Sequence, residues 1–141
     1  MKPILGKSDY FDFSELQLTE VPCKIDSGAY MSVIHCTDAT VTDGELEFKF
    51  GKHSAFKFPE KTYKTPKYTV KEITSSNGES EKRYTISTAI KIFGKEYETI
   101  FTLTDRLSMN SPVLIGRLAL ASFLIDVTKK NQSFESKYRE D

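Results

Sequence analysis

Hydrophobic and polar residues alternate with a period of two in several short stretches of this chain. The clearest stretch is Glu45-Leu46-Glu47-Phe48-Lys49-Phe50, and a second covers residues 96–103. This alternation is typical of a strand with one buried face. Asp43-Gly44, Asn77-Gly78 and Gly94-Lys95 each lie between two strand-like runs, which predicts hairpins at these positions. The pattern therefore predicts an all-β fold.

The segments outside these hairpins give a coarser picture. Strands are predicted at 21–26, 31–35 and 123–127, where apolar and β-branched residues gather. Residues 10–18 mix aromatic and acidic side chains and are interpreted as an irregular, partly buried connector. The compact helix-favouring run is Leu118-Ala119-Leu120-Ala121, which predicts one short helix near the C-terminal end.

Composition and charge support one domain that has no nucleic-acid partner. A chain of 141 residues can bury a core, and seven Tyr and ten Phe without Trp suit pleated surfaces. Residues 1–128 are interpreted as the domain and the polar residues 129–141 as a C-terminal tail. The 20 basic and 20 acidic residues cancel, so no overall field favours nucleic acid. No segment has the roughly 18 apolar residues of a membrane span.

Two cysteines, Cys23 and Cys36, lie on either side of a Ser27-Gly28 turn. We expect them to be free, partly buried thiols. The first residues lack the charged head, apolar stretch and cleavage site of a leader. The chain as given therefore favours the cytoplasm, whereas export would follow if a leader had been removed.

The strongest chemical signal is a carboxylate at the end of an apolar strand. Asp26 follows Lys24-Ile25 and precedes the tight turn Ser27-Gly28-Ala29, and residues 112–117 supply an apolar run with a glycine that can pack beneath this turn. Metal-free amide hydrolysis needs a base to activate water and an acid to protonate the leaving nitrogen, and two close carboxylates can share these roles. Each part occurs once, so the chain predicts half an active site. A two-fold homodimer would supply the second Asp26.

The residues Asp26-Ser27-Gly28-Ala29 and Leu114-Ile115-Gly116-Arg117 resemble the paired signatures of retropepsin-like aspartic peptidases. More closely, the chain is similar to a bacterial retropepsin-like family whose members often carry the label ATP-dependent zinc protease. The resemblance extends over most of the chain. It includes residues 4–7, 24–35, 75–78 with Glu81 and Arg83, 103–109, 116–117 and 123–126.

This resemblance implies an all-β, retropepsin-like closed barrel with one short C-terminal helix. It implies an aspartic endopeptidase that acts as a homodimer on a peptide or protein substrate, without a metal or other cofactor. Asp26 would be the catalytic carboxylate, Ser27 would brace the loop through its hydroxyl, and Gly28 would let backbone approach backbone. Ala29 and Tyr30 would contact substrate. The scaffold beneath the loop would be Leu114, Ile115, Gly116 and Arg117.

One departure from the family pattern concerns the residue after Ala29. Many retropepsins carry an acidic residue there, which can pair with the arginine after the supporting glycine, whereas this chain has Tyr30. Arg117 must then find another partner, and Asp105 and Asp126 are both candidates. We expect Arg117 to form a half-buried ion pair of the framework.

Two segments between the signatures have open roles. The Asn77-Gly78 hairpin occupies the position of the retropepsin flap, so its tip would bind an extended peptide; an ordinary surface hairpin is the other interpretation. Arg83, two residues after Glu81, would face the same side and either line the cleft or lie on a solvated strand face. Residues 37–67 are an insertion relative to viral retropepsins and would extend the sheet, rim the cleft or shield an edge.

Other chemistries find little support in the sequence. There is no His-Glu-x-x-His motif, and Cys23, His35, Cys36 and Asp38 are poor zinc ligands because adjacent residues on a strand point to opposite faces. No phosphate-binding Gly-x-x-x-x-Gly-Lys-Ser/Thr and no Gly-x-Ser-x-Gly elbow occur.

A non-catalytic function remains open beside the peptidase. The same fold could bind peptide in a groove or act as an interaction module. Members of the family resemble partners of ATP-grasp ligases that add amino acids to peptide tails. The resemblance therefore implies that such tails are the substrate and are trimmed or processed.

Overall fold

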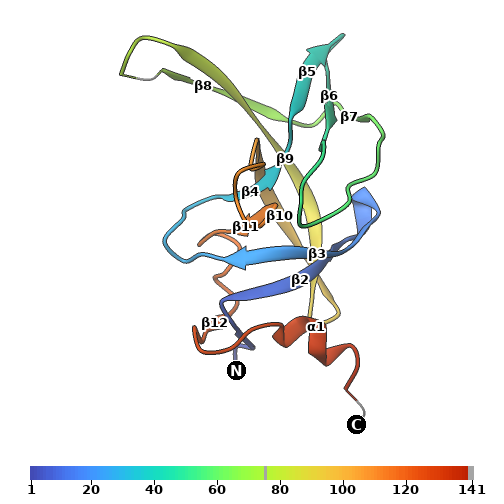
Figure 1. Cartoon of the computed structure of the whole chain (residues 1–141), viewed down its shortest axis with the longest axis vertical. Coiled ribbons are helices and arrows are strands. Elements are labelled where there is room, and N and C mark those ends of the chain that lie inside the picture. Colours follow the sequence, from blue (N-terminus) through green and yellow to red (C-terminus); the bar gives the residue numbers. More distant parts are fainter. Residues whose placement is uncertain (75, 140–141) are drawn as a thin grey trace.

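Six strands close a barrel that forms the body of the protein (Figure 1). The structure is a computed structural model that describes residues 1–74 and 76–139. Around the barrel the strands run β10, β4, β11, β3, β2 and β9, and β9 pairs back with β10. This architecture confirms the predicted retropepsin-like barrel. The barrel strands are β2 (Ser8–Phe13), β3 (Leu18–Ile25), β4 (Ser32–His35), β9 (Ser80–Ile92), β10 (Lys95–Thr104) and β11 (Val113–Ile115).

The three predicted hairpins are confirmed. β9 turns into β10 through Phe93 and Gly94, whose φ angles of 53° and 77° give the left-handed turn that matches strand twist. Asp43 and Gly44, at 52° and 76°, join β5 (Asp38–Thr42) to β6 (Glu45–Lys49) in the same way. β8 (Thr69–Thr74) pairs with β9 around Asn77-Gly78 and projects with it beyond the barrel (Figure 1). Ser75, part of the family resemblance, lies outside the described residues.

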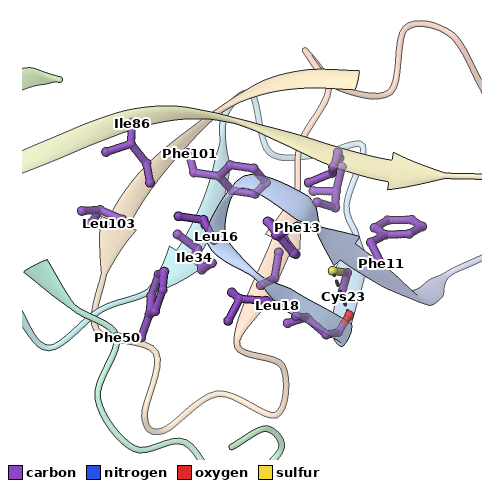
Figure 2. Close-up of a cluster of buried hydrophobic side chains, with 14 of the residues drawn as sticks. Phe11, Phe13, Leu16, Leu18, Cys23, Ile34, Phe50, Ile86, Phe101 and Leu103 are labelled. Atoms are coloured by element: carbon purple, nitrogen blue, oxygen red, sulfur yellow. Dashed lines mark hydrogen bonds between the residues drawn. The ribbon is translucent and has the colours of Figure 1, made fainter. Parts of the chain in front are cut away.

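Apolar side chains from alternate strand positions fill the barrel (Figure 2). In β2, Phe11 and Phe13 are fully buried while Tyr10 and Asp12 are less so, which is the period-two pattern of a strand. The rings of Phe13 and Phe101 lie 5.4 Å apart. Each such side chain contributes roughly 1.5–3 kcal/mol by leaving water.

Residues 37–67 form a separate antiparallel sheet of β5, β6 and β7 (Tyr63–Thr65) beside the barrel. Phe50, just after β6, is fully buried and belongs to the same core as the barrel residues. Its ring stacks on Phe58 at 4.9 Å. Residues 51–57 between these two anchors are called the insert loop below.

Two predictions about local structure are wrong. Residues 10–18, expected to be an irregular connector, contain barrel strand β2, the short 3-10 helix η1 (Ser14–Leu16) and the start of β3. Residues 118–121 form turns instead of a helix, and the N–H groups of Ala119 and Leu120 donate to carbonyls only three residues earlier, at 116 and 117. The one α-helix of the described residues is α1, Gln132–Ser136.

Helix α1 lies in the polar tail and packs on β2. The buried carboxylate of Asp9 accepts hydrogen bonds from the N–H groups of Ser133 at 2.8 Å and Phe134 at 3.0 Å. Burial raises the pKa of Asp9, although these hydrogen bonds oppose the rise. Phe134 also contacts the Tyr10 ring at 5.1 Å. A buried acid in β2, rather than the composition of the tail, therefore orders the segment.

The remaining elements lie at the edge of the barrel. β12 (Leu124–Ile125) falls within the strand predicted at 123–127 and pairs in parallel with β1 (Ile4–Leu5). Cys23 and Cys36 are free, as predicted, and are buried rather than partly buried. Burial raises the pKa of both thiols, that of Cys36 to about 11, so both are neutral at pH 7. Among the described residues, no helix has the length and apolar character to span a membrane.

Candidate active site

Asp26 is positioned by two parallel strands. β11 lies beside β3 with Ile115 opposite Ile25, and it also pairs with β4 in the antiparallel sense. Directly after β3, the N–H of Asp26 donates to the Ile115 carbonyl at 2.9 Å. The half-buried side chain of Asp26 therefore lies at the end of β3, where hydrogen bonds from the neighbouring strand β11 hold the backbone in place.

The turn after Asp26, residues 26–31, is called the Asp26 loop below. The Asp26 carboxylate accepts a hydrogen bond from the Gly28 N–H at 2.9 Å, and the Asp26 carbonyl accepts one from Ala29 at 3.2 Å. Ser27 is exposed, and its hydroxyl makes no hydrogen bond within the described residues. The buried hydroxyl that braces this region belongs to Ser32, whose Oγ accepts from the Gly116 N–H at 3.0 Å. A role of Ser32 was not predicted from the sequence.

Gly116 is required by close backbone contact. A Cβ atom here would lie 2.5 Å from the Met31 carbonyl oxygen and 2.9 Å from that of Ala29, closer than real Cβ atoms approach. The next two residues continue the contact, since Arg117 N–H donates to Ala29 O at 2.7 Å and Leu118 N–H to Tyr30 O at 3.2 Å. The predicted apolar run and glycine thus lie directly against the Asp26 loop.

The predicted ion pair of Arg117 is wrong. Arg117 is exposed, and its guanidinium donates to the backbone carbonyls of Ser27 at 3.1 Å and Gly28 at 3.4 Å. It also lies 5.8 Å from the Tyr30 ring centre, at the outer limit of a cation–π contact. Carbonyl oxygens of the loop therefore replace the acidic partner that Tyr30 removes.

Arg106 is a site residue that the sequence analysis missed. Its half-buried guanidinium donates from Nε to the Ser111 carbonyl at 2.9 Å. Burial lowers the pKa of Arg106, and the negative charge of Asp26 opposes that change, so the two charges interact. The sequence signal was present, because Arg106 lies in the segment 103–109 that carried the family resemblance.

Both histidines of the chain hold the backbone of Arg106. His35 is fully buried; its Nδ1 accepts from the Arg106 N–H at 2.9 Å, so its Nε2 is protonated and donates to the Lys52 carbonyl at 3.0 Å. His53 accepts from Ala55 N–H at Nδ1 and donates from Nε2 to the Arg106 carbonyl at 3.1 Å. All four ring nitrogens are used by the backbone, so neither ring has a lone pair left for a metal ion.

The residues predicted on the hairpin have contacts within the hairpin itself. Asn77 Oδ1 accepts from the Glu79 N–H at 3.2 Å, and Gly78 has a φ of 86°. Arg83 lies 3.8 Å from Glu81, in agreement with two residues on one face of a strand. A role of Asn77, Gly78 and Arg83 in substrate binding stays a prediction.

Together, a strand-terminal Asp, a tight Ser-Gly turn, and a parallel strand with a glycine beneath it define the class of retropepsin-like folds. A model of the RimB-like family, described as retropepsin-like aspartic endopeptidase RimB, matches residues 4–135. The chain therefore belongs to the RimB-like family.

Comparisons with individual proteins agree on the fold and differ in name. A crystal structure of a protein of unknown function from Legionella pneumophila superposes with a TM-score of 0.74 at 19% identity, covering 94% of this chain and 99% of that one. A protein from Shewanella pealeana named a probable alpha-L-glutamate ligase is 34% identical over 125 residues, and one of the same name from Desulfotalea psychrophila is 31% identical over 129. These matches cover 86% and 88% of this chain but only 27% and 28% of the relatives.

Proposed function

We propose that the protein is an aspartic endopeptidase that works as a homodimer, with Asp26 of each subunit forming the catalytic pair. The observation that carries this proposal is the bracing of Asp26 by Ile115 and of its loop by Gly116 and Arg117. Such bracing fixes a carboxylate at one position, as catalysis requires. The described residues contain one such loop, so a second copy has to complete the pair.

The reaction follows from two carboxylates that approach closely. They cannot both ionise, so the pair holds one proton between its two carboxylates. The ionised Asp26 takes a proton from a bound water, which attacks the peptide carbonyl. The protonated Asp26 of the other subunit stabilises the developing oxyanion, and a proton then passes to the leaving nitrogen.

Exposed apolar side chains on the Asp26 loop and on the segments that follow β10 and β11 support association of two subunits. Tyr30, Leu107, Met109 and Leu118 are each more than half exposed, at 59%, 56%, 53% and 52%. The backbone N–H of Leu118 donates a hydrogen bond to the Tyr30 carbonyl, so these two residues are neighbours. Burial of such residues between subunits would stabilise a dimer. The exposed Ser27 hydroxyl would find its hydrogen-bond partner across the same axis.

The substrate class follows from the relatives and is part of the proposal. The relatives carry the name of an alpha-glutamate ligase, and this chain corresponds to about a quarter of their length. A peptidase domain attached to or working beside such a ligase would act on glutamate-rich peptide tails. We therefore propose acidic peptides as substrates.

The test replaces Asp26 and a matched exposed acid. Asp26→Asn keeps the size of the side chain but removes the base, so hydrolysis of a glutamate-rich peptide should fall by about 1000-fold or more. Asp43→Asn is the control, because Asp43 lies in an exposed turn at a φ of 52°, which Asn tolerates well. Cleavage in wild type should increase on mild acidification, because one carboxylate of the pair has to be protonated.

Each outcome decides between the two functions. Loss of cleavage in Asp26→Asn alone supports the peptidase. Equal cleavage by both variants would exclude Asp26 as the catalytic group. Binding of the peptide by a dimer of wild type without any cleavage would make the domain a peptide-binding module.

A further inference from the structure

A hollow of about 770 Å³ lies in the inserted segment, outside the Asp26 loop. It is lined by Lys49 and residues 51–61. Apolar groups of Phe56, Phe58 and Pro59 contribute to its wall, together with lysines. This volume falls within the range of pockets that hold ligands.

The shape of the hollow is fixed by contacts at both ends of the insert loop. Phe50 and Phe58 are buried and stacked on each other. Between them, Gly51 has a φ of 81°, and its Cα lies so near Thr37 that a Cβ would meet the Thr37 hydroxyl. His35 then holds the Lys52 carbonyl at 3.0 Å. The loop is therefore built into one conformation, which reduces the entropy that a ligand would have to remove.

Positive charge is concentrated around this hollow. Its lining contains Lys49, Lys52, Lys57 and Lys61 against the single acid Glu60, so the formal charge of residues 49–61 is 4 − 1 = +3, with His53 neutral. The whole chain has a net charge of zero. Among the described residues, none of these four lysines is in an ion pair, whereas Lys64 and Lys137 each have one. Lys61 donates to Gln17 at 3.2 Å and lies over the Tyr63 ring.

We propose that the insert hollow is a second binding site, which takes a carboxylate-rich segment of a peptide. Ammonium groups without an acidic partner would hold the carboxylates, and the apolar walls would pack against the methylene groups of glutamate side chains. This hollow is linked to Asp26 through Arg106. His53 donates a hydrogen bond to the Arg106 carbonyl at 3.1 Å, and the charge of Arg106 interacts with that of Asp26. A long acidic substrate could therefore be held in the insert hollow while another part lies at Asp26. Only this kinetic consequence rests on the proposed peptidase function.

Binding can be measured in the full chain carrying Asp26→Asn, so that no cleavage interferes. The probe is fluorescein-labelled octaglutamate, followed by anisotropy at about 50 mM salt, where screening is weak. In this background Lys52→Gln/Lys57→Gln should weaken binding about fivefold, because each exposed lysine contributes a fraction of a kcal/mol. The matched control is Lys91→Gln/Lys95→Gln, which removes the same charge from exposed positions outside the insert. It should leave the affinity within about a factor of 1.5.

Equal weakening by both double variants, or by neither, would overturn the proposal. So would tighter binding of a labelled single-stranded DNA octamer that is lost in the same Lys52/Lys57 variant, because the hollow would then recognise phosphates of nucleic acid. Circular dichroism of each variant checks that the sheet is retained.

A kinetic experiment with Asp26 intact separates this proposal from the function above. The Lys52→Gln/Lys57→Gln variant should raise KM for long acidic peptides and leave kcat unchanged, with no effect on a neutral peptide. If wild type binds octaglutamate in the hollow but cleaves no peptide, the peptidase proposal fails and the binding site stands. If wild type cleaves and the lysines have no effect on binding or KM, the binding site alone fails.

Discussion

The Asp26 loop and the insert loop are both irregular and both lie beside the barrel, but different groups hold them in place. The Asp26 loop is fixed mainly by backbone hydrogen bonds with Ile115, Arg117 and Leu118. The insert loop is fixed by side chains, above all the rings of His35 and His53. Backbone hydrogen bonds survive most side-chain substitutions, but they are broken when an added side-chain atom pushes the two backbones apart. Side-chain hydrogen bonds are lost when that one residue is replaced or changes its protonation state. The two loops should therefore respond to different perturbations.

The largest effect is expected from Gly116→Ala, which attacks the backbone contact. The new methyl group would meet the Met31 and Ala29 carbonyls, and neither can move without breaking the loop. We expect a loss of roughly 3 kcal/mol in the free energy of unfolding, together with loss of hydrolysis. Urea denaturation measures the first and a peptide-cleavage assay the second. Gly44→Asn is the control, since a Cβ there meets nothing within 4 Å; comparable destabilisation by Gly44→Asn would show that the close approach at Gly116 is not the cause.

Gly51→Ala should have a smaller effect, confined to the insert loop. Alanine is strained at a φ of 81°, and its methyl group would displace Thr37. We expect a cost of roughly 1–2 kcal/mol in the free energy of unfolding and faster amide hydrogen exchange in residues 51–57, with little change around Asp26. Faster exchange in both loops would mean that they are not held independently.

Acidification should loosen the insert loop before the Asp26 loop, through His35. Burial lowers its pKa most, and unfavourable electrostatic interactions with His53 and Arg106 lower it further, while the Lys52 carbonyl and Asp105, 3.9 Å away, oppose this. The unfolded chain then takes up the proton more readily, so the stability due to neutral His35 is present above pH about 6.5 and is lost as the pH falls below it. The loss is at most about 1.4 kcal/mol per pH unit for one proton.

Urea midpoints at pH 7.5 and 5.5 measure this dependence. His35→Gln should be less stable than wild type at pH 7.5, because the Lys52 and Arg106 hydrogen bonds are weakened, but it should lose less stability on acidification. The same slope in wild type and His35→Gln would assign the pH dependence to another group. If the slope is confirmed, acid-favoured hydrolysis and acid-weakened folding would together limit the working pH.

The smallest effect is expected from Arg117→Lys. Lysine keeps the charge but cannot reach two carbonyls with a planar group, so contacts to Ser27 and Gly28 weaken. Because Arg117 and its partners are exposed, we expect the free energy of unfolding to fall by less than about 1 kcal/mol and kcat to drop about two- to fivefold. A loss as large as that of Asp26→Asn would show that Arg117 takes part in the reaction itself.

Backbone-determined features of this molecule were predictable from sequence. Asp-Gly, Asn-Gly and Gly-Lys between alternating stretches predicted three hairpins that the structure contains, and the apolar run ending at Gly116 predicted the strand beneath Asp26. These signals are local, because turn type and strand period are written in neighbouring residues.

Features that depend on distant partners were missed. Helix α1 forms because the buried Asp9 bonds its first N–H groups, and those residues are more than 120 positions apart in the sequence. Arg117 was expected to find a carboxylate and instead bonds loop carbonyls, which no composition rule reveals. Arg106 and Ser32 act through contacts that only the folded barrel brings together.

The most direct test of a shared catalytic pair mixes wild-type and Asp26→Asn subunits. After the subunits have exchanged fully, an equal mixture at fixed total protein should retain about one quarter of the wild-type rate, because only dimers with two intact Asp26 residues can cleave. A rate near one half would mean that each subunit acts with its own Asp26, and it would contradict the account.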